Sequence, residues 1–165
     1  MPDDVTRGQR LERLKFIERL VLIPILLLAV GAYFCFGRAQ VVGVSMFPTL
    51  KPGQKVTILK AWQRFSPLRE GDVIVIGVRV GMKNRDEDVV KRVIFIQNAT
   101  GTRQWPATIT TPAGTFPTAA LFRGGVVNLT TPKGIYVLGD NINNSTDSRD
   151  FGAVSESEII GKVLR

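Results

Sequence analysis

The sequence predicts a mainly β protein: a partly open, barrel-like β domain with an N-terminal transmembrane helix. Three observations support this prediction: an uncharged apolar run over residues 20–36, a series of short β-rich segments after it, and the Gly, Pro and Asn residues that separate those segments. A chain of 165 residues suffices for one ordinary domain and one appendage. We therefore expect an N-terminal segment over residues 1–19, an anchor helix over 20–37 and a β-rich domain over 38–165.

The apolar run lies at the short end of the length that crosses the hydrocarbon core, about 17–25 residues. Arg19 and Arg38 bound it, and Tyr33 and Phe36 suit a membrane interface. A buried core helix and a cleaved secretory signal are alternative interpretations. A fully apolar run of this length is unusual in so small a domain, and no clear small-x-small cleavage site follows promptly. The sequence therefore favours a retained signal-anchor.

The distribution of basic residues predicts how this helix is oriented. Five Lys and Arg residues precede the run, and only Arg38 follows it closely. The positive-inside rule then predicts a single-pass protein of the inner or plasma membrane, with a cytoplasmic N-terminus and an extracytoplasmic β domain. Apolar residues recur at every third position from residue 11 to residue 20. We therefore expect the helix to extend back through the basic segment, with a solvated basic tail as the alternative.

Seven segments after the apolar run have the composition of short strands. They are residues 39–44, 54–59, 72–78, 89–96, 126–129, 135–138 and 159–164. Pro52-Gly53 and Glu70-Gly71-Asp72 predict turns, and residues 79–88 predict a polar, hairpin-like connection. Residues 98–125 are rich in Thr, Pro and Gly and give only weak strand signals. This succession of short strands predicts an all-β, partly open barrel-like domain.

The composition restricts the chemistry that is available. The chain contains no histidine, which excludes Ser-His-Asp and Cys-His sites and histidine-ligated metals. Its one cysteine, Cys35, lies in the apolar run, so neither an internal disulfide nor a thiolate cluster is available. We expect no metal and no cofactor, and a hydrolase would need lysine, aspartate or glutamate as its base. The net charge of +8 fits nucleic acid, anionic lipid or simple solubility, and does not decide among them.

Lys91 is the first candidate for a base. Strand alternation over residues 89–96 places Val89, Lys91, Val93 and Phe95 on one apolar face. Desolvation on such a face lowers the pKa of a lysine, and a neutral amine can take a proton from a serine hydroxyl. Taken alone, the segment favours instead an edge-strand lysine whose ammonium group reaches water.

Ser45 is the matching candidate for a nucleophile. It follows a predicted strand and precedes Met46-Phe47-Pro48, in which proline restrains the chain. Gly43 permits the close backbone approach that a substrate strand would need. Taken alone, however, Ser45 is interpreted as an ordinary polar residue at the end of a strand.

A polar loop after the strand at residues 135–138 is the third unusual segment. Its Asp, Asn, Ser and Thr side chains over residues 140–149 can satisfy their own backbone through Asx- and ST-turns. Asp147 and Arg149 can pair with other groups, and Arg92 is a candidate partner for Asp147. An ordered turn would explain this loop, but it also suits a scaffold that holds a catalytic amine.

Together these segments resemble the signal peptidase I family, which includes bacterial enzymes and the mitochondrial inner-membrane peptidases. The matching motifs are Ser-Met-x-Pro-Thr from Ser45, Lys-Arg-Val-Ile from Lys91, and Gly-Asp-Asn followed by Asn-Ser-x-Asp-Ser-Arg-x-x-Gly from Gly139 to Gly152. Each motif alone is weak. Their combination, in this order after a membrane anchor, is highly specific.

The resemblance implies a role for each matching residue. Ser45 would attack the scissile carbonyl, Lys91 would accept its proton and pass it to the leaving amine, and Ser145 would orient the Lys91 amine. Asp147 and Arg149 match a structural ion pair, and the other supporting positions are Arg92, Asp140 and Asn141. The positions assigned to the substrate cleft are Val44, Met46 and Pro48.

The chain departs from the family pattern at two places. Gly43 stands where some members carry a serine that donates its hydroxyl to the oxyanion. The oxyanion would then depend on backbone N–H groups, with the Ser45 N–H first. Residues 95–98 replace the glycine-rich turn that follows Lys-Arg-Val-Ile in many relatives.

The resemblance implies a membrane-bound serine endopeptidase that removes signal peptides from exported preproteins with small-x-small cleavage sites, bound as an extended strand. Its partners would be these preproteins and membrane lipid, with no nucleic acid. The alternatives are a specialised peptidase that matures conjugation or pilus proteins, and a non-enzymatic bitopic β domain of envelope assembly. A self-cleaving repressor also uses a Ser-Lys pair, but the apolar run and the absence of a DNA-reading helix pair argue against it. Lys51, Lys55 and Lys60 either favour anionic headgroups or form a solvated surface.

Overall fold

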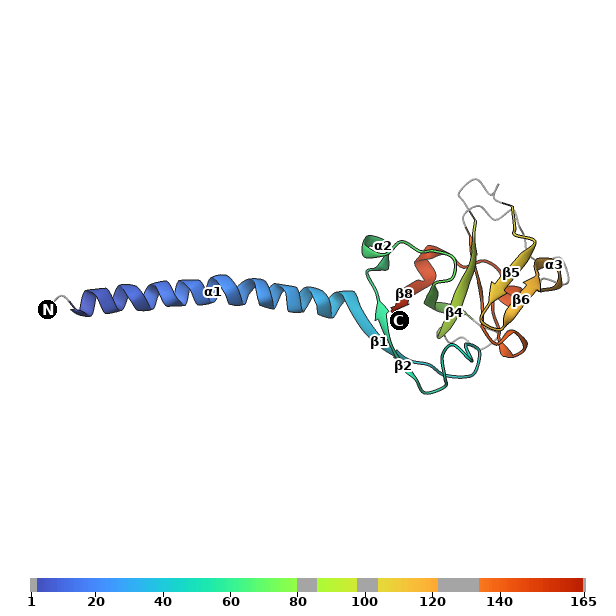
Figure 1. The fold of residues 1–165 in the computed structure, drawn as a ribbon, viewed down its shortest axis with the longest axis horizontal. Helices are drawn as coiled ribbons and strands as arrows, with labels where there is room; N and C mark the ends of the chain where they lie inside the picture. Colours follow the sequence, from blue (N-terminus) through green and yellow to red (C-terminus); the bar gives the residue numbers. More distant parts are fainter. Residues whose placement is uncertain (1–2, 80–85, 98–103, 122–133, 165) are drawn as a thin grey trace. The chain divides into compact units, whose positions relative to one another are not determined.

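The computed structural model describes residues 3–79, 86–97, 104–121 and 134–164. The chain divides into two compact units, Met1–Phe36 and Gly37–Arg165. The first unit is formed by the long helix α1 (Asp3–Cys35), and the second holds the strands and the remaining short helices (Figure 1).

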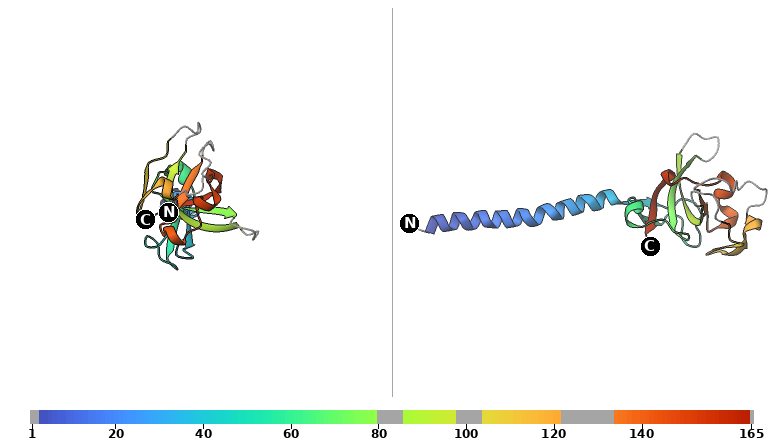
Figure 2. Two further views of the ribbon diagram at one scale, coloured as in Figure 1. Left: turned by 90° about the vertical axis from the view of Figure 1, so that its right-hand side faces the viewer. Right: turned by 90° about the horizontal axis from the view of Figure 1, so that it is seen from above.

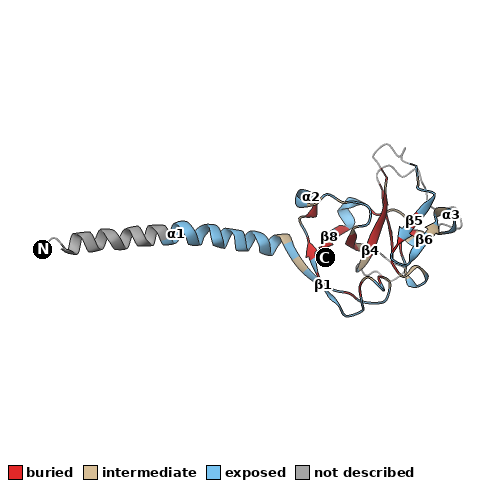
Figure 3. Cartoon of the chain, in the orientation of Figure 1, coloured by how far each residue is buried: buried red, intermediate tan, exposed pale blue. Residues whose placement is uncertain are grey.

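Helix α1 runs without interruption through the basic segment and the apolar run, as the three-residue spacing of apolar side chains predicted. Its stretch Glu18–Cys35 is long and apolar enough to cross a membrane, and no part of it is buried in the structure (Figure 3). Pro24 lies inside the helix without ending it, which membrane helices tolerate. A helix that exposes apolar side chains all round is a candidate membrane span.

The second unit is built on an open, six-stranded sheet with the strand order β1-β2-β8-β3-β4-β7. The strands are β1 (Phe36–Gln40), β2 (Lys55–Leu59), β3 (Val73–Arg79), β4 (Asp86–Ile96), β7 (Ile135–Leu138) and β8 (Ile159–Leu164). The pairs β2·β8, β8·β3, β3·β4 and β4·β7 are antiparallel. The C-terminal strand β8, drawn in red in Figure 2, lies beside the green strand β3. The prediction of a mainly β, partly open fold with an N-terminal apolar helix is confirmed.

Smaller elements complete this unit. The strands β5 (Thr108–Thr111) and β6 (Gly114–Pro117) form a separate two-stranded sheet. The short helices are α2 (Trp62–Phe65), α3 (Thr118–Leu121), η1 (Ile142–Asn144), α4 (Ser148–Phe151) and η2 (Glu156–Glu158). The hairpin β5–β6 was not predicted, because residues 98–125 gave weak strand signals. The strand predicted at 126–129 lies outside the described residues.

The segment before Ser45 differs from its prediction. The expected strand at 39–44 is wrong, because β1 ends at Gln40 and the chain then turns. Gly43 has φ +82°, a left-handed conformation that glycine adopts readily and other residues adopt at a cost. Ser45 therefore lies in a turn between β1 and β2 and not at the end of a strand.

A register shift divides β4 into two parts. Val93 pairs with Val137, whereas Phe95 pairs with Tyr136, so β4 contains one extra residue, as in a β-bulge. Phe95 stacks on Trp105 with ring centroids 4.2 Å apart, in a different core cluster from Val93. The prediction that Phe95 shares the face of Lys91 and Val93 is therefore wrong. Lys91 itself lies on a central strand, since β4 has β3 on one side and β7 on the other.

Candidate functional site

Lys91 lies on an apolar face of the sheet. It pairs across the sheet with Ile74 of β3, and alternation along β4 places Val89 and Val93 on its own face. Ile74 and Val93 are fully buried, and Lys91 is only 3% exposed. No described residue accepts a hydrogen bond from its amine. The edge-strand lysine that the segment alone favoured is therefore wrong, because β4 lies between β3 and β7 and Lys91 is buried.

Burial lowers the pKa of the Lys91 amine, because the charged form loses its hydration. Three charged groups nearby modulate this effect. Asp147 raises the pKa, Arg149 lowers it and Asp150 raises it. The structure thus places the Lys91 amine within electrostatic range of the loop after β7.

The same loop holds the turn that contains Ser45. The backbone N–H of Asn141 donates to the Ser45 carbonyl at 2.8 Å, and the Asn141 side-chain amide donates to the Val44 carbonyl at 3.2 Å. The backbone N–H and the hydroxyl of Ser45 make no hydrogen bond to any described residue. Both groups are therefore available to a ligand.

Gly139, at the end of β7, is where these segments meet. A β-carbon at this position would lie 2.6 Å from the Ser45 carbonyl oxygen and would also collide with the Ser145 side chain. Ser45 and Ser145 thus pack directly against the Gly139 α-carbon. The sheet register pairs Arg92 with Leu138, and its next step sets Lys91 opposite Gly139. Ser45, Lys91 and Ser145, far apart in the sequence, converge around this glycine.

Ser145 presents a second polar group without a partner. Its Oγ atom is buried, and no hydrogen bond to it exists among the described residues. A buried hydroxyl that lacks a hydrogen bond is costly and rare. The Ser145 carbonyl, in contrast, accepts a hydrogen bond from Arg149 Nη2 at 3.2 Å. The site therefore brings together a buried amine and a buried hydroxyl, each with unused hydrogen-bonding capacity.

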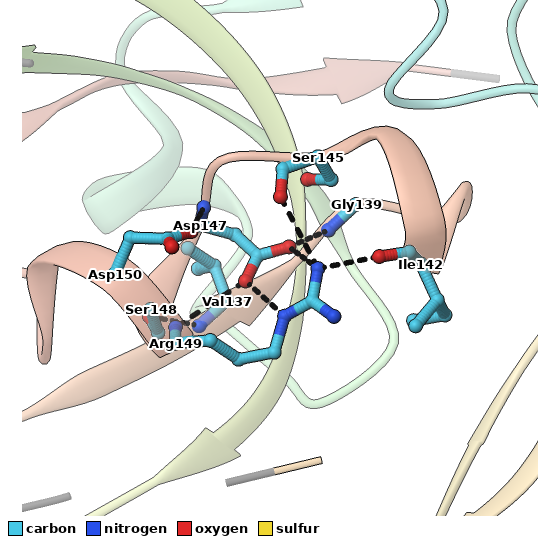
Figure 4. Close-up of polar contacts among 8 residues, drawn as sticks. All are labelled: Val137, Gly139, Ile142, Ser145, Asp147, Ser148, Arg149 and Asp150. Carbon is cyan, nitrogen blue, oxygen red and sulfur yellow. Dashed lines mark hydrogen bonds and ion pairs between the residues drawn. The ribbon is translucent and has the colours of Figure 1, made fainter. Parts of the chain in front are cut away.

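Asp147 organises the loop behind Ser145 (Figure 4). Its carboxylate is fully buried and accepts hydrogen bonds from Arg149 Nε at 2.8 Å and from the Gly139 N–H at 3.0 Å. Asp147 also caps helix α4, in a capping box with Asp150. Arg149 Nη2 donates in addition to the Ile142 carbonyl at 2.7 Å. The Asp147–Arg149 pair thus fixes the loop against the end of β7.

Arg92 forms the second buried ion pair of the site. Its Nε and Nη2 atoms donate to the two carboxylate oxygens of Asp140 at 2.7 and 2.6 Å. Its Nη1 atom donates to the Gly71 carbonyl at 2.7 Å, and Nη2 also reaches Thr49 Oγ1 at 3.4 Å. Arg92 therefore pairs with Asp140, and the Asp147 partner considered from the sequence is wrong. The guanidinium ties the loop after β7 to the start of β3 and to the turn of Ser45.

The residues assigned to the substrate cleft separate into two groups. Val44 is 48% exposed and Pro48 is also exposed, so both can contact a ligand. Met46 is only 1% exposed and packs in the core beneath the turn. A hollow of about 400 Å³ adjoins the turn, and sequence reasoning missed it because the β5–β6 hairpin contributes to it. Its lining consists of Phe47, Pro48, Ala113, Phe116 and residues 140–143.

In the part of the chain that the structure describes, no group of three His, Cys, Asp or Glu side chains could hold a metal ion. The buried carboxylates of Asp140 and Asp147 are each occupied by an arginine. The Ser45 hydroxyl and the buried Lys91 amine, neither of which is bonded to a described residue, remain as the candidate reactive groups.

Known proteins resemble this chain over most of its length. A family model described as "Signal peptidase, peptidase S26" matches residues 13–97 and 113–165. Signal peptidase IB of Staphylococcus aureus is 32% identical over 173 residues, which cover 92% of this chain and 87% of that protein. Signal peptidase I of Bacillus caldolyticus is 29% identical over 158 residues, which cover 86% of this chain and 84% of that protein.

Proposed function

Because the chain belongs to the signal peptidase family, peptidase S26, we propose that it cleaves signal peptides from exported preproteins with Ser45 as nucleophile and Lys91 as general base. The observation that carries this proposal is the buried Lys91 amine, which has no acceptor among the described residues and lies on the strand opposite Gly139. The turn of Ser45 packs against the same glycine. Family membership makes the chain a peptidase, and the Ser-Lys mechanism is the finer step that we infer.

Burial gives Lys91 the property that a base requires. A lowered pKa increases the fraction of neutral amine at working pH. The neutral amine takes the proton of the Ser45 hydroxyl while Oγ attacks the scissile carbonyl. The resulting ammonium donates this proton to the nitrogen of the scissile C–N bond as that bond breaks, which leaves an acyl-enzyme on Ser45. Lys91 then deprotonates the water that attacks this ester, and it returns the proton to Ser45 Oγ as the ester bond breaks. No histidine or metal is needed for any of these steps.

Ser145 is suited to position the Lys91 amine. Its buried Oγ has no partner among the described residues and could accept a hydrogen bond from the amine in either protonation state. Asp147 and Asp150 favour the ammonium form that appears during the reaction, since both raise the pKa of Lys91. Burial thus lowers the pKa of Lys91, whereas these two carboxylates raise it.

The Ser45 backbone N–H is the first candidate for the oxyanion donor. It makes no hydrogen bond to a described residue, and it belongs to the residue whose Oγ would attack. Gly43 supplies no hydroxyl, and its φ of +82° would strain a serine there. We therefore propose an oxyanion hole of backbone donors.

The substrate would bind as an extended strand across the turn of Ser45, with its small-x-small cleavage site at the dyad. Val44 and Pro48 are the exposed assigned residues, while Met46 supports the turn from the core. Helix α1 would anchor the enzyme, with the N-terminus in the cytoplasm and the β domain on the extracytoplasmic face. This topology would place the active site on the side to which preproteins are exported.

The test is processing of a preprotein by the full chain in proteoliposomes. We expect Lys91→Met to reduce cleavage about 10²–10⁴-fold, the usual contribution of a positioned base. Ser45→Ala removes the attacking oxygen and should reduce cleavage at least as much. Lys91→Arg should fail as well, because a guanidinium group cannot act as a base at neutral pH.

Lys162→Met is the matched control. Lys162 also pairs with Ile74, on the other side of β3, so the two lysines occupy one row of the sheet. Lys162, however, is bonded to Asp72 at 2.8 Å and to Ser66 at 2.9 Å. Its replacement should leave the activity of folded enzyme intact. Normal cleavage by Lys91→Met, or an equal loss in Lys162→Met, would exclude Lys91 as the base.

A further inference from the structure

The segment from residue 36 to residue 69 contains six basic residues and no acidic one. The six are Arg38, Lys51, Lys55, Lys60, Arg64 and Arg69. We propose that four of them, Arg38, Lys55, Lys60 and Arg64, form a basic surface that binds anionic phospholipid headgroups in the leaflet where α1 ends. This proposal goes beyond membrane anchoring by α1 and does not depend on the Ser-Lys mechanism.

The four side chains are available and lie on adjoining elements. Arg38 and Lys55 occupy exposed positions of the neighbouring strands β1 and β2, on the face opposite the buried Val56 and Ile58. Lys60 follows β2 and its stem lies against Gly37 of β1, and Arg64 belongs to the adjoining helix α2.

None of the four has an ion-pair partner in the described part of the chain, whereas Lys162 of β8 is paired with Asp72. Unpaired cations at the β1 edge of the sheet, in a segment without acidic residues, create a positive potential suited to an anionic partner.

Chain connectivity favours lipid as this partner. Helix α1 ends at Cys35 and β1 begins at Phe36, so no linker separates the apolar span from the sheet. Arg38 follows Phe36 by two residues, which span about 7 Å in a strand. The headgroup region of one leaflet is about 5–8 Å thick. Arg38 therefore starts at headgroup depth when the apolar stretch Glu18–Cys35 lies in the hydrocarbon.

An exposed aromatic side chain accompanies these charges. Phe65, next to Arg64 in α2, is 63% exposed. Basic and aromatic side chains together are typical of surfaces that lie in a membrane interface. Each Lys or Arg near an anionic surface strengthens binding about fivefold, provided that it lies within a Debye length of about 8 Å at physiological salt.

Binding at this surface would also set the height of the active site. The turn that contains Ser45 connects β1 to β2, and both strands contribute to the basic surface. Holding these strands at the headgroups fixes the distance between Ser45 and the bilayer.

Hydrogen exchange of the full chain in lipid nanodiscs tests the proposal. Discs of phosphatidylcholine alone are compared with discs that also contain phosphatidylglycerol. We expect slower amide exchange over residues 36–41 and 54–66 in the anionic discs only. This difference should disappear at about 1 M salt, where the Debye length falls to about 3 Å.

The variant R38Q/K55Q/K60Q/R64Q should lose the difference between the discs. Two double variants of equal charge separate this surface from general attraction. K60Q/R64Q should show a partial loss, whereas the control variant K51Q/R69Q, which removes two other exposed cations, should retain the difference. Thermal unfolding verifies that all three variants fold. Identical exchange in both kinds of disc, or the same loss in the control variant, would overturn the proposal.

Discussion

Lys91 and Arg92 are adjacent buried cations on β4, and their surroundings are opposite. Arg92 is 6% exposed and donates to both oxygens of Asp140 and to the Gly71 carbonyl. Lys91 is 3% exposed and has no acceptor among the described residues. Because side chains alternate along a strand, the two neighbours face different environments. The guanidinium group of Arg92 is held by three described oxygen atoms, whereas the Lys91 amine has no described acceptor.

The chemistry of the two side chains fits this division. A guanidinium group stays charged, so its burial requires partners, and Arg92 has them. An amine can lose its proton instead, and burial lowers the pKa of Lys91 accordingly. The Arg92–Asp140 pair also positions the loop that carries Asn141, whose N–H binds the Ser45 carbonyl. The Arg92–Asp140 pair thus ties β4, which carries Lys91, to the turn of Ser45.

The largest expected effect is the difference between Arg92→Met and Lys91→Met in the free energy of unfolding. Arg92→Met leaves the Asp140 carboxylate buried without its partner, and we expect the free energy of unfolding to fall by about 3–5 kcal/mol. Lys91→Met removes an amine that has no described acceptor, so the free energy of unfolding should stay unchanged or rise. Denaturant unfolding of the full chain in detergent measures both.

A second variant of the same pair makes this comparison stricter. Asp140→Asn should destabilise the chain as Arg92→Met does. The double variant Arg92→Met/Asp140→Asn should lose less stability than the sum of the two single losses, because both substitutions break one interaction. Equal destabilisation by Lys91→Met and Arg92→Met would show that the contrast between the two cations is wrong.

Local patterns in the sequence predicted the elements that depend on local chemistry. The strands β7 and β8 have the predicted bounds, because β7 is an apolar run between two glycines and β8 is a largely apolar run between Glu158 and Arg165. The face of Lys91 followed from alternation with Val89 and Val93, two residues away on either side. The continuous helix α1 followed from the spacing of its apolar residues.

Features that depend on distant residues were not accessible in this way. Arg92 and Asp140 are 48 positions apart, and nothing in either segment distinguishes Asp140 from Asp147 as the partner. The bulge that separates Phe95 from the face of Lys91 arises in the pairing with β7, and not in β4 alone. Gly139 belonged to a motif, but its contact with Ser45 depends on three-dimensional packing.

The next effect concerns Ser145 and Ser148, two serines of one loop with opposite hydrogen bonding. Ser145 Oγ has no described partner, whereas Ser148 Oγ accepts the buried Val137 N–H at 2.8 Å. Ser145→Ala should lower kcat about 10–100-fold, the value of one hydrogen bond to a charged group, without loss of stability. Ser148→Ala should lower the free energy of unfolding by about 1–3 kcal/mol and preserve the activity of folded enzyme.

Preprotein cleavage and denaturant unfolding of both variants would test this crossed pattern. Full activity in Ser145→Ala would contradict a role for its hydroxyl in positioning Lys91. An equal loss of stability in the two variants would show that Ser145 Oγ is bonded in solution.

The smallest expected effect is a shift in pH dependence. If Lys91 is the base, kcat/KM rises with pH through the pKa of its amine, which burial places below the 10.5 of an ordinary lysine. Between the lowered pKa of Lys91 and 10.5, the folded chain binds fewer protons than the unfolded chain. The contribution of Lys91 to stability therefore rises with pH over this range. Asp150 raises this pKa. Asp150→Asn should therefore move the rising limb of kcat/KM to lower pH.

Glu158→Gln provides the control for this shift, since Glu158 occupies the same position in a second capping box. Its carboxylate accepts the Ser155 N–H at 2.7 Å, as Asp150 accepts the Asp147 N–H at 2.9 Å, but it does not act on Lys91. The pH profile of Glu158→Gln should match that of the unmodified chain. A shift to higher pH in Asp150→Asn, or an equal shift in both variants, would mean that the titrating group is not the Lys91 amine. A limb that moves in Asp150→Asn alone would assign the rise in kcat/KM to deprotonation of the Lys91 amine.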